Sequence, residues 1–218
     1  MSNFLKKMNN SKRIIEEKLK QARRKVEKKT ISNNTRLPPG QTLTSKFPIL
    51  DLGIIPDIDI SNWKLRIFGL VKKELNISFE ELKNFSQTQE ISDFHCVTHW
   101  SKFDVQWGGV IAKEILDSAS ILKEADFATL YSYDNYTTNI PLKVLLDKDV
   151  IIAHQVYNKP LSLEHGGPVR MVIPKRYAWK SAKWLKAIEI HKGDKLGFWE
   201  VRGYNNNADP WKEERYSE

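Results

Sequence analysis

The positive charge of this chain is confined to its first 30 residues. Residues 1–30 hold 11 Lys and Arg against 3 Glu, a net charge of +8, whereas the rest of the chain holds 24 basic and 24 acidic side chains and is formally neutral. Nucleic-acid binding needs basic residues that neutralise phosphates, so the neutral part gives no reason to expect a nucleic-acid partner. The fold is therefore expected in the neutral part, behind a basic segment.

The basic segment has the pattern of an amphipathic helix over residues 11–29. Apolar residues repeat there near the spacing of one helix face: Ile14, Ile15, Leu19, Ala22 and Val26. Thr35 to Gly40, with two prolines, predicts an extended linker. We expect 1–36 to form a basic helix and linker and 37–218 to form one domain. The helix is expected to lie solvated on the domain, and a membrane-surface or partner-docking helix is the alternative.

No run of the sequence approaches the roughly 18 consecutive apolar residues of a membrane span. Residues 1–7 lack the apolar stretch of a secretory signal, and Arg23-Arg24-Lys25 is followed by Val26-Glu27-Lys28-Lys29, where a twin-arginine signal needs apolar residues. The sequence therefore predicts a cytoplasmic protein with no membrane span.

Strands and short helices alternate along the domain without the regular order of parallel βαβ units. Ser78 and Glu81 form a capping box that opens one helix, and a second is expected at 110–116. Strands are expected at 63–71, 91–97, 127–133, 150–153, 168–173 and 186–191. This order predicts an α+β fold with a largely antiparallel or mixed sheet.

The chain has one cysteine, Cys96, in the segment Phe94-His95-Cys96-Val97-Thr98-His99-Trp100-Ser101. A lone thiol forms no intrachain disulfide, so it is an inert buried side chain, a nucleophile or a metal ligand. Two histidines and two tryptophans lie within a dozen residues of it, more polar and aromatic surroundings than a plain core strand needs.

A second informative segment is His165-Gly166-Gly167-Pro168-Val169-Arg170. Arg170 stands among apolar strand residues, where an unpaired guanidinium is costly. Its partner is expected to be a phosphate or carboxylate ligand, with a structural ion pair to a buried Asp or Glu as the alternative. Lys180, Ser181 and Lys183 follow, and with Arg170 they resemble an anion pocket.

These segments, with Trp107-Gly108-Gly109-Val110, Tyr177 and Trp184, resemble the sulfite oxidase-type molybdenum-cofactor oxidoreductases over about residues 37–200. The resemblance implies the molybdopterin-binding fold of that family, with a mixed β-sheet or barrel and short helices. It also implies that the Cys96 thiolate binds the molybdenum beside the dithiolene of one molybdopterin, and a soft thiolate suits such a metal.

The resemblance assigns further site residues by their positions. His165 and Arg170 match residues that hold the pterin and its phosphate, and the loop of Ser181, Ala182 and Lys183 matches a phosphate-binding loop. An early segment expected to touch the pterin contains Ser45, Phe47 and Pro48. Tyr136, Thr137 and Thr138 fall where the family places a residue on the substrate side. His99 and Trp100 are expected to line the substrate mouth, and His95 to hydrogen-bond near the metal.

Departures from the family pattern limit what the resemblance implies. Ser101 and Lys102 stand where sulfite oxidases place a substrate-binding arginine, so sulfite is not implied. The residues around Cys96 are closer to the branch that includes the catalytic subunit of periplasmic methionine sulfoxide reductase. No haem-binding extension is recognised, so we expect an external electron-transfer partner.

The sequence thus predicts a molybdopterin oxidoreductase that exchanges an oxygen atom and two electrons with a small-molecule substrate. Two alternatives stay open. One is a zinc site formed by His95, Cys96 and His99, although a fourth ligand at a usual interval is missing. The other is a cofactor-free domain, with a Cys96–His nucleophile or with the basic helix as an interaction module.

Overall fold

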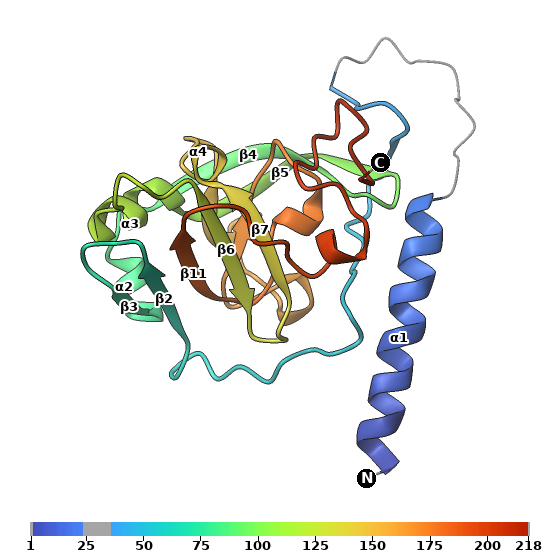
Figure 1. Cartoon of the computed structure of the whole chain (residues 1–218), viewed down its shortest axis with the longest axis horizontal. Helices are drawn as coiled ribbons and strands as arrows, with labels where there is room; N and C mark the ends of the chain where they lie inside the picture. Colours follow the sequence, from blue (N-terminus) through green and yellow to red (C-terminus); the bar gives the residue numbers. More distant parts are fainter. Residues whose placement is uncertain (1, 24–35, 218) are drawn as a thin grey trace.

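The computed structural model describes residues 2–23 and 36–217, and the second range folds into two β-sheets with a few short helices (Figure 1). Within these residues the six-stranded sheet has the order β1 (Thr42–Leu43), β5 (Trp100–Ile111), β8 (Ile151–Val156) and β10 (Arg170–Val172), with β4 (Thr88–His95) beside β5 and β9 (Lys159–Pro160) beside β8. The five-stranded sheet has the order β3 (Leu75–Ser78), β2 (Lys64–Gly69), β11 (Leu185–His191), β6 (Phe127–Ser132) and β7 (Thr137–Pro141).

The α-helices are short apart from the first. They are α1 (Ser2–Arg23), α2 (Phe79–Lys83), α3 (Ala112–Ala119) and α4 (Leu142–Leu145), and 3₁₀ turns lie at Leu163–His165, Ala178–Lys180 and Glu200–Arg202. Strand β1 runs parallel to β5 and β2 runs parallel to β11, whereas the other pairs of named strands are antiparallel. The predicted α+β class with a mixed sheet is therefore confirmed.

Most predicted elements are present with shifted boundaries, and two of these shifts have a clear local cause. The helix expected at 110–116 begins only at Ala112, because Val110 and Ile111 finish β5 and pair with Ile152 and Ile151. The strand expected at 91–97 ends at His95. It ends there because the chain turns sharply at Cys96, whose N–H donates to the Trp100 carbonyl at 2.9 Å.

Strands β8 and β10 of the six-stranded sheet are largely buried on both faces. Ile152 and Met171 belong to the main apolar core, which also contains Leu65 and Ile188 of the other sheet. Ile151 and Val172, their neighbours along the strands, belong to a second cluster with Phe94 and Trp107. Alternation along β8 and β10 produces the two faces. The strand ends that carry Cys96 and Arg170 are therefore held in a rigid frame.

Helix α1 lies alongside the segment that leads from β1 to β2 (Figure 1). Ile15 and Leu19 pack against the core, and the Tyr216 hydroxyl donates to the Leu19 carbonyl at 3.3 Å. The helix begins earlier than expected, at Ser2; residues 24–29, with Val26, and Thr35 of the expected linker lie outside the described residues.

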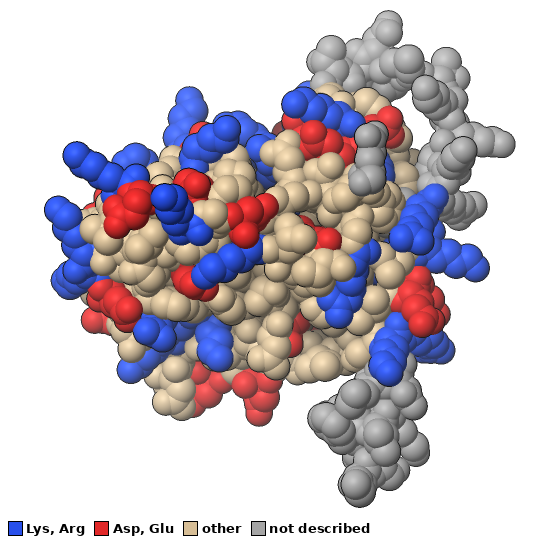
Figure 2. Space-filling model, in the orientation of Figure 1, with Lys and Arg blue, Asp and Glu red and all other residues tan. Residues whose placement is uncertain are grey.

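The surface shows no single basic stripe on the face drawn in Figure 2, where Lys and Arg are interspersed with Asp and Glu. Over residues 2–23 and 36–217, no helix combines the length and the hydropathy that crossing a bilayer requires.

Candidate functional site

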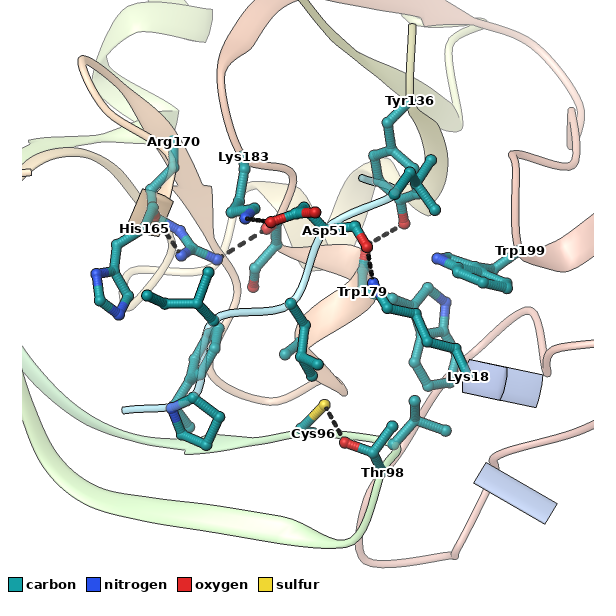
Figure 3. A pocket seen from close by; sticks show the side chains of 18 of the residues that line it. Lys18, Asp51, Cys96, Thr98, Tyr136, His165, Arg170, Trp179, Lys183 and Trp199 are labelled. Carbon is teal, nitrogen blue, oxygen red and sulfur yellow. Dashed lines mark hydrogen bonds and ion pairs between the residues drawn. The ribbon is translucent and has the colours of Figure 1, made fainter. Parts of the chain in front are cut away.

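A cavity surrounds Cys96 and brings together residues that are far apart in the sequence (Figure 3). Nine of the residues predicted from the sequence line it: Phe47, Pro48, Cys96, Trp100, Tyr136, His165, Arg170, Ser181 and Lys183. They come from the segment after β1, from the β4–β5 and β6–β7 turns, and from the chain between β9 and β11.

The thiol of Cys96 is buried at the cavity wall, and its sulfur lies 3.1 Å from the Thr98 hydroxyl oxygen. The turn that carries it is tied down, because the Cys96 carbonyl accepts hydrogen bonds from His99 N–H at 3.1 Å and from the Gln41 amide at 3.0 Å. Burial raises the pKa of the thiol, whereas Thr98 and the charges of Lys18 and Arg215 favour the thiolate. The thiolate is the form that binds metals.

Arg170, the first residue of β10, is a buried cation. Its guanidinium donates to the carbonyls of His165 at 2.8 Å and Ser181 at 3.0 Å, and it lies 5.2 Å from the ring centroid of Phe94 and 5.3 Å from that of Trp107. No Asp or Glu of the described residues forms an ion pair with it, and burial lowers its pKa to about 9. The structural ion pair considered from the sequence is thus absent from the described part, and the charge lacks an anionic partner.

Lys183 places a second cation near the first. Its ammonium donates to the Glu164 carbonyl at 2.8 Å and lies 4.0 Å from the Asp51 carboxylate. Burial and the charge of Arg170 lower its pKa to about 8. Gly166, at a φ of 102°, permits this approach, because a Cβ there would lie 2.9 Å from Cβ of Lys183. Two neighbouring cations with a single carboxylate, 4.0 Å from one of them, fit a phosphate group.

His165 is oriented by bonds at both ring nitrogens. Nε2 donates to the Phe47 carbonyl at 3.3 Å, so Nδ1 accepts from the Ser162 hydroxyl at 3.0 Å when the ring is neutral. The rings of Phe47 and His165 are 4.5 Å apart, and Phe47 also contacts Trp100 at 6.4 Å between centroids. An aromatic wall therefore encloses one side of the cavity.

The loop of Ser181 and Ala182 is fixed to β10 and the residue after it. The Ala182 carbonyl accepts from Met171 N–H at 2.8 Å, and the Ser181 hydroxyl accepts from Ile173 N–H at 2.9 Å. Ala182 itself does not line the cavity. These bonds set the position of Lys183, which follows directly.

The two histidines beside Cys96 do not line the cavity. Nδ1 of His95 lies 2.8 Å from the Ser101 hydroxyl, and burial lowers the pKa of His95 to about 4. Nδ1 of His99 donates to the Gly40 carbonyl at 2.8 Å. Among the described residues the sulfur has only Thr98 as a polar side-chain partner, and no three His, Cys, Asp or Glu form a metal-binding group. In the described part of the chain, the zinc alternative therefore lacks a ligand set, and the Cys–His alternative lacks a histidine base beside the sulfur.

Ser45, Thr137 and Thr138 also lie outside the cavity lining. Ser45 is exposed and its carbonyl accepts from Lys102 at 2.7 Å. Thr138 is buried and donates to the Glu200 carboxylate at 2.9 Å. Tyr136, two residues earlier, is the member of that segment that lines the cavity.

Several lining residues were not predicted from the sequence: Lys18, Asp51, Thr98, Asp134, Trp179, Trp199 and Tyr204. For Lys18 a signal existed, since it follows Ile14 by four positions and Ile15 by three on the apolar side of the helix. The others lie in turns and loops, whose positions depend on the fold.

Two buried polar atoms at the cavity have no hydrogen-bond partner within the described chain, Nε1 of Trp100 and Oγ of Ser132. Leaving such groups unpaired is costly. The charge of Arg170 has no carboxylate partner among the described residues, and that of Lys183 is only partly compensated by Asp51. With a soft sulfur at Cys96, the residues present fit a ligand that offers a phosphate, further polar groups and a thiophilic metal.

Comparisons with known proteins agree with this chemistry. The family model described as oxidoreductase molybdopterin binding domain matches residues 52–199. The uncharacterized oxidoreductase YuiH of Bacillus subtilis is 40% identical over 183 residues, which cover 84% of this chain and 92% of that protein. The catalytic subunit MsrP of the protein-methionine-sulfoxide reductase of Campylobacter jejuni is 28% identical over 166 residues, covering 68% of this chain and 56% of the subunit.

Two further matches cover smaller shares of longer proteins. The NADPH nitrate reductase of Emericella nidulans is 28% identical, with 78% of this chain and 24% of that enzyme covered. The crystal structure of the sulfane dehydrogenase SoxCD from Paracoccus pantotrophus superposes with a TM-score of 0.62 at 20% identity, covering 72% of this chain and 46% of that chain. This likeness confirms the predicted sulfite oxidase-type fold. The chain is an oxidoreductase that belongs to the sulfite oxidase-like molybdopterin-dependent family, and its cofactor is molybdopterin.

Proposed function

We propose that this enzyme carries out two-electron oxygen-atom transfer on a small substrate, with molybdenum held by the thiolate of Cys96. The observation that carries the proposal is that the buried thiol lines the same cavity as two incompletely compensated cations, Arg170 and Lys183 (Figure 3). A soft metal ligand and an anion-binding pair are the two groups that a molybdenum–molybdopterin centre needs.

Different side chains bind different parts of the cofactor on this proposal. Arg170 and Lys183 bind the phosphate, the Ser181–Lys183 loop positions them, and Phe47 with His165 packs against the pterin and excludes water. When bound, the cofactor supplies the two-electron redox chemistry, while the protein supplies orientation and polarity. Four of the predicted residues that do not line the cavity support the loops around it on this proposal: Ser45, His95, His99 and Thr138.

Trp100 and the residues of the Tyr136 segment form the substrate side of the cavity on the same proposal. Reducing equivalents pass to or from an external partner. Because two relatives are a nitrate reductase and a protein-methionine-sulfoxide reductase subunit, nitrate and methionine sulfoxide are the first oxygen donors to assay. The cytoplasmic location expected from the sequence belongs to this proposal and is tested by cell fractionation.

The test compares wild type with Cys96→Ser in a host that synthesises the cofactor, measuring molybdenum by elemental analysis and pterin by fluorescence. We expect wild type to contain both in equal amounts. Cys96→Ser should lose most of its molybdenum and all turnover of the active oxygen donor, because a hydroxyl is a hard ligand of high pKa. Unchanged turnover in Cys96→Ser would refute the proposal, as would wild type that holds pterin without molybdenum.

A further inference from the structure

Helix α1 forms part of the cavity wall. Ile14 and Leu19 hold the helix on the domain. Ile14 packs on Gly53 so closely that a Cβ added to Gly53 would lie 2.5 Å from Cδ1 of Ile14. Lys18 follows Ile14 by four positions and Ile15 by three, so it lies near both on the helix face that packs on the domain. Its side chain therefore points toward the domain and lines the cavity, while Lys20 on the other side of the helix is exposed.

The ammonium of Lys18 is only partly compensated. It donates to the backbone carbonyl of Asp51, and no carboxylate of the described residues lies within ion-pair distance. The Asp51 carboxylate is engaged by Gly53 N–H at 2.8 Å and faces Lys183. An ammonium has three donors, so Lys18 keeps hydrogen-bonding capacity for a ligand.

The nearby carboxylate of Asp134 does not use up that capacity. Its Oδ1 accepts from Tyr136 N–H at 3.0 Å, and it acts on Lys18 only through its charge. Lys102, the basic residue nearest Cys96 in the sequence, donates instead to the Ser45 carbonyl and does not line the cavity. Lys18 is therefore the basic side chain that α1 adds to this end of the cavity.

The basic side chains of the cavity lie at different ends. Figure 3 shows Arg170 and His165 on one side and Lys18 with Trp199 on the other, with Cys96 between them. Since the first end suits the cofactor phosphate, a substrate that reaches the sulfur from the other end meets Lys18. Charge-assisted hydrogen bonds from an ammonium favour anionic oxygen acceptors over neutral ones.

We propose that Lys18 of helix α1 is a specificity-determining residue that selects small oxyanions as substrates. This inference rests on the proposed function, in which Arg170 and Lys183 are occupied by the cofactor. The N-terminal helix is on this view a part of the substrate site and not only a solvated attachment to the domain.

The test measures binding of inorganic sulfate to the cofactor-loaded full chain by titration calorimetry at fixed ionic strength. Molybdenum and pterin are quantified first in wild type, Lys18→Gln, Lys18→Arg and the matched control Lys20→Gln. We expect all four to load equally. Lys18→Gln should bind sulfate about 10- to 100-fold more weakly, the loss of one charge-assisted hydrogen bond. Lys18→Arg and Lys20→Gln should stay within about threefold of wild type, since both keep a cation at position 18.

The outcomes separate the two proposals. Wild type without molybdenum refutes the proposed function. Equal loading with equal sulfate affinity in wild type and Lys18→Gln refutes only the role of Lys18, as does a loaded wild type that binds no sulfate. Loss of pterin in Lys18→Gln also overturns the inference, because Lys18 would then hold the cofactor.

Discussion

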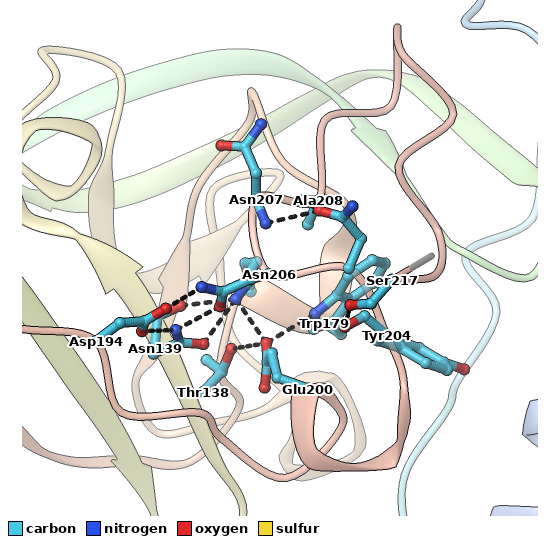
Figure 4. A network of polar contacts seen from close by, with 12 residues as sticks. Thr138, Asn139, Trp179, Asp194, Glu200, Tyr204, Asn206, Asn207, Ala208 and Ser217 are labelled. Carbon is cyan, nitrogen blue, oxygen red and sulfur yellow. Dashed lines mark hydrogen bonds and ion pairs between the residues drawn. The ribbon is translucent and has the colours of Figure 1, made fainter.

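Lys180 and Glu200 form a fully buried ion pair, with 2.6 Å between the ammonium nitrogen and Oε1. The same carboxylate oxygen accepts from the Thr138 hydroxyl at 2.9 Å and from Nε1 of Trp179 at 3.0 Å (Figure 4). Burial lowers the pKa of Lys180, and the charge of Glu200 raises it. The pair thus fixes the 3₁₀ turn that carries Trp179, a residue of the cavity wall, to strand β7.

Glu200→Gln should be strongly destabilising, because it leaves the Lys180 ammonium buried without a carboxylate. We expect a loss of about 3–5 kcal/mol in the free energy of unfolding, measured by urea titration. The control is Glu74→Gln, which breaks the exposed pair with Arg66 and should cost at most about 1 kcal/mol. Equal losses in the two variants would contradict this role.

Arg170→Met should lower pterin content without lowering the melting temperature of the cofactor-free protein. The guanidinium is buried with no carboxylate partner among the described residues, so its removal relieves an uncompensated charge there. Pterin fluorescence and thermal unfolding of the cofactor-free form give the two readouts, and Arg66→Met at an exposed position of β2 is the control. Full pterin occupancy in Arg170→Met would show that another residue holds the phosphate.

The lowered pKa of Lys183 predicts that the stability of the cofactor-free protein depends on pH. Its pKa is about 8 in the folded state against 10.5 in the unfolded chain, so the unfolded state binds more protons between these values. The destabilisation of the folded state by the buried charge is therefore full below pH 8, decreases as the pH rises from 8, and is absent above pH 10.5. The melting-temperature advantage of Lys183→Met over wild type should shrink from pH 7 to pH 10. A constant difference would contradict the shift.

Deletion of residues 1–30 should lower the melting temperature, because Ile15 and Leu19 leave the apolar surface they cover. The sequence alone allowed the opposite result, a helix whose removal affects only association with an acidic partner. The double variant Lys12→Gln/Arg13→Gln removes exposed charge without truncation and should melt like wild type. An unchanged melting temperature after deletion would restore the partner-docking role and remove α1 from the fold.

Sequence patterns correctly predicted features that depend on residues close together in the chain. The capping box at Ser78 is confirmed with both of its hydrogen bonds, because residues three positions apart determine it. The start of α3 was misplaced, since a short apolar run such as Val110-Ile111 fits a strand as well as a helix. The motif residues Cys96, Arg170 and Lys183 do meet in one cavity.

What the sequence did not locate depends on tertiary packing. The sequence singled out Tyr136, Thr137 and Thr138 together, and only Tyr136 lines the cavity, because the face of each side chain is set by strand register. Lys18 enters the cavity only because the Ile14–Leu19 face docks beside Gly53. No local pattern specifies such a contact between distant segments.

The central claim is that the sulfur of Cys96 is bonded to molybdenum. X-ray absorption at the molybdenum edge of the loaded protein tests it most directly, because it counts the sulfur neighbours of the metal. Cys96 is the one cysteine of the chain, so a protein sulfur at the metal has one cysteine source. We predict one sulfur neighbour more than the dithiolene supplies in wild type, and loss of that sulfur in the molybdenum retained by Cys96→Ser. The same sulfur count in both proteins would contradict the account.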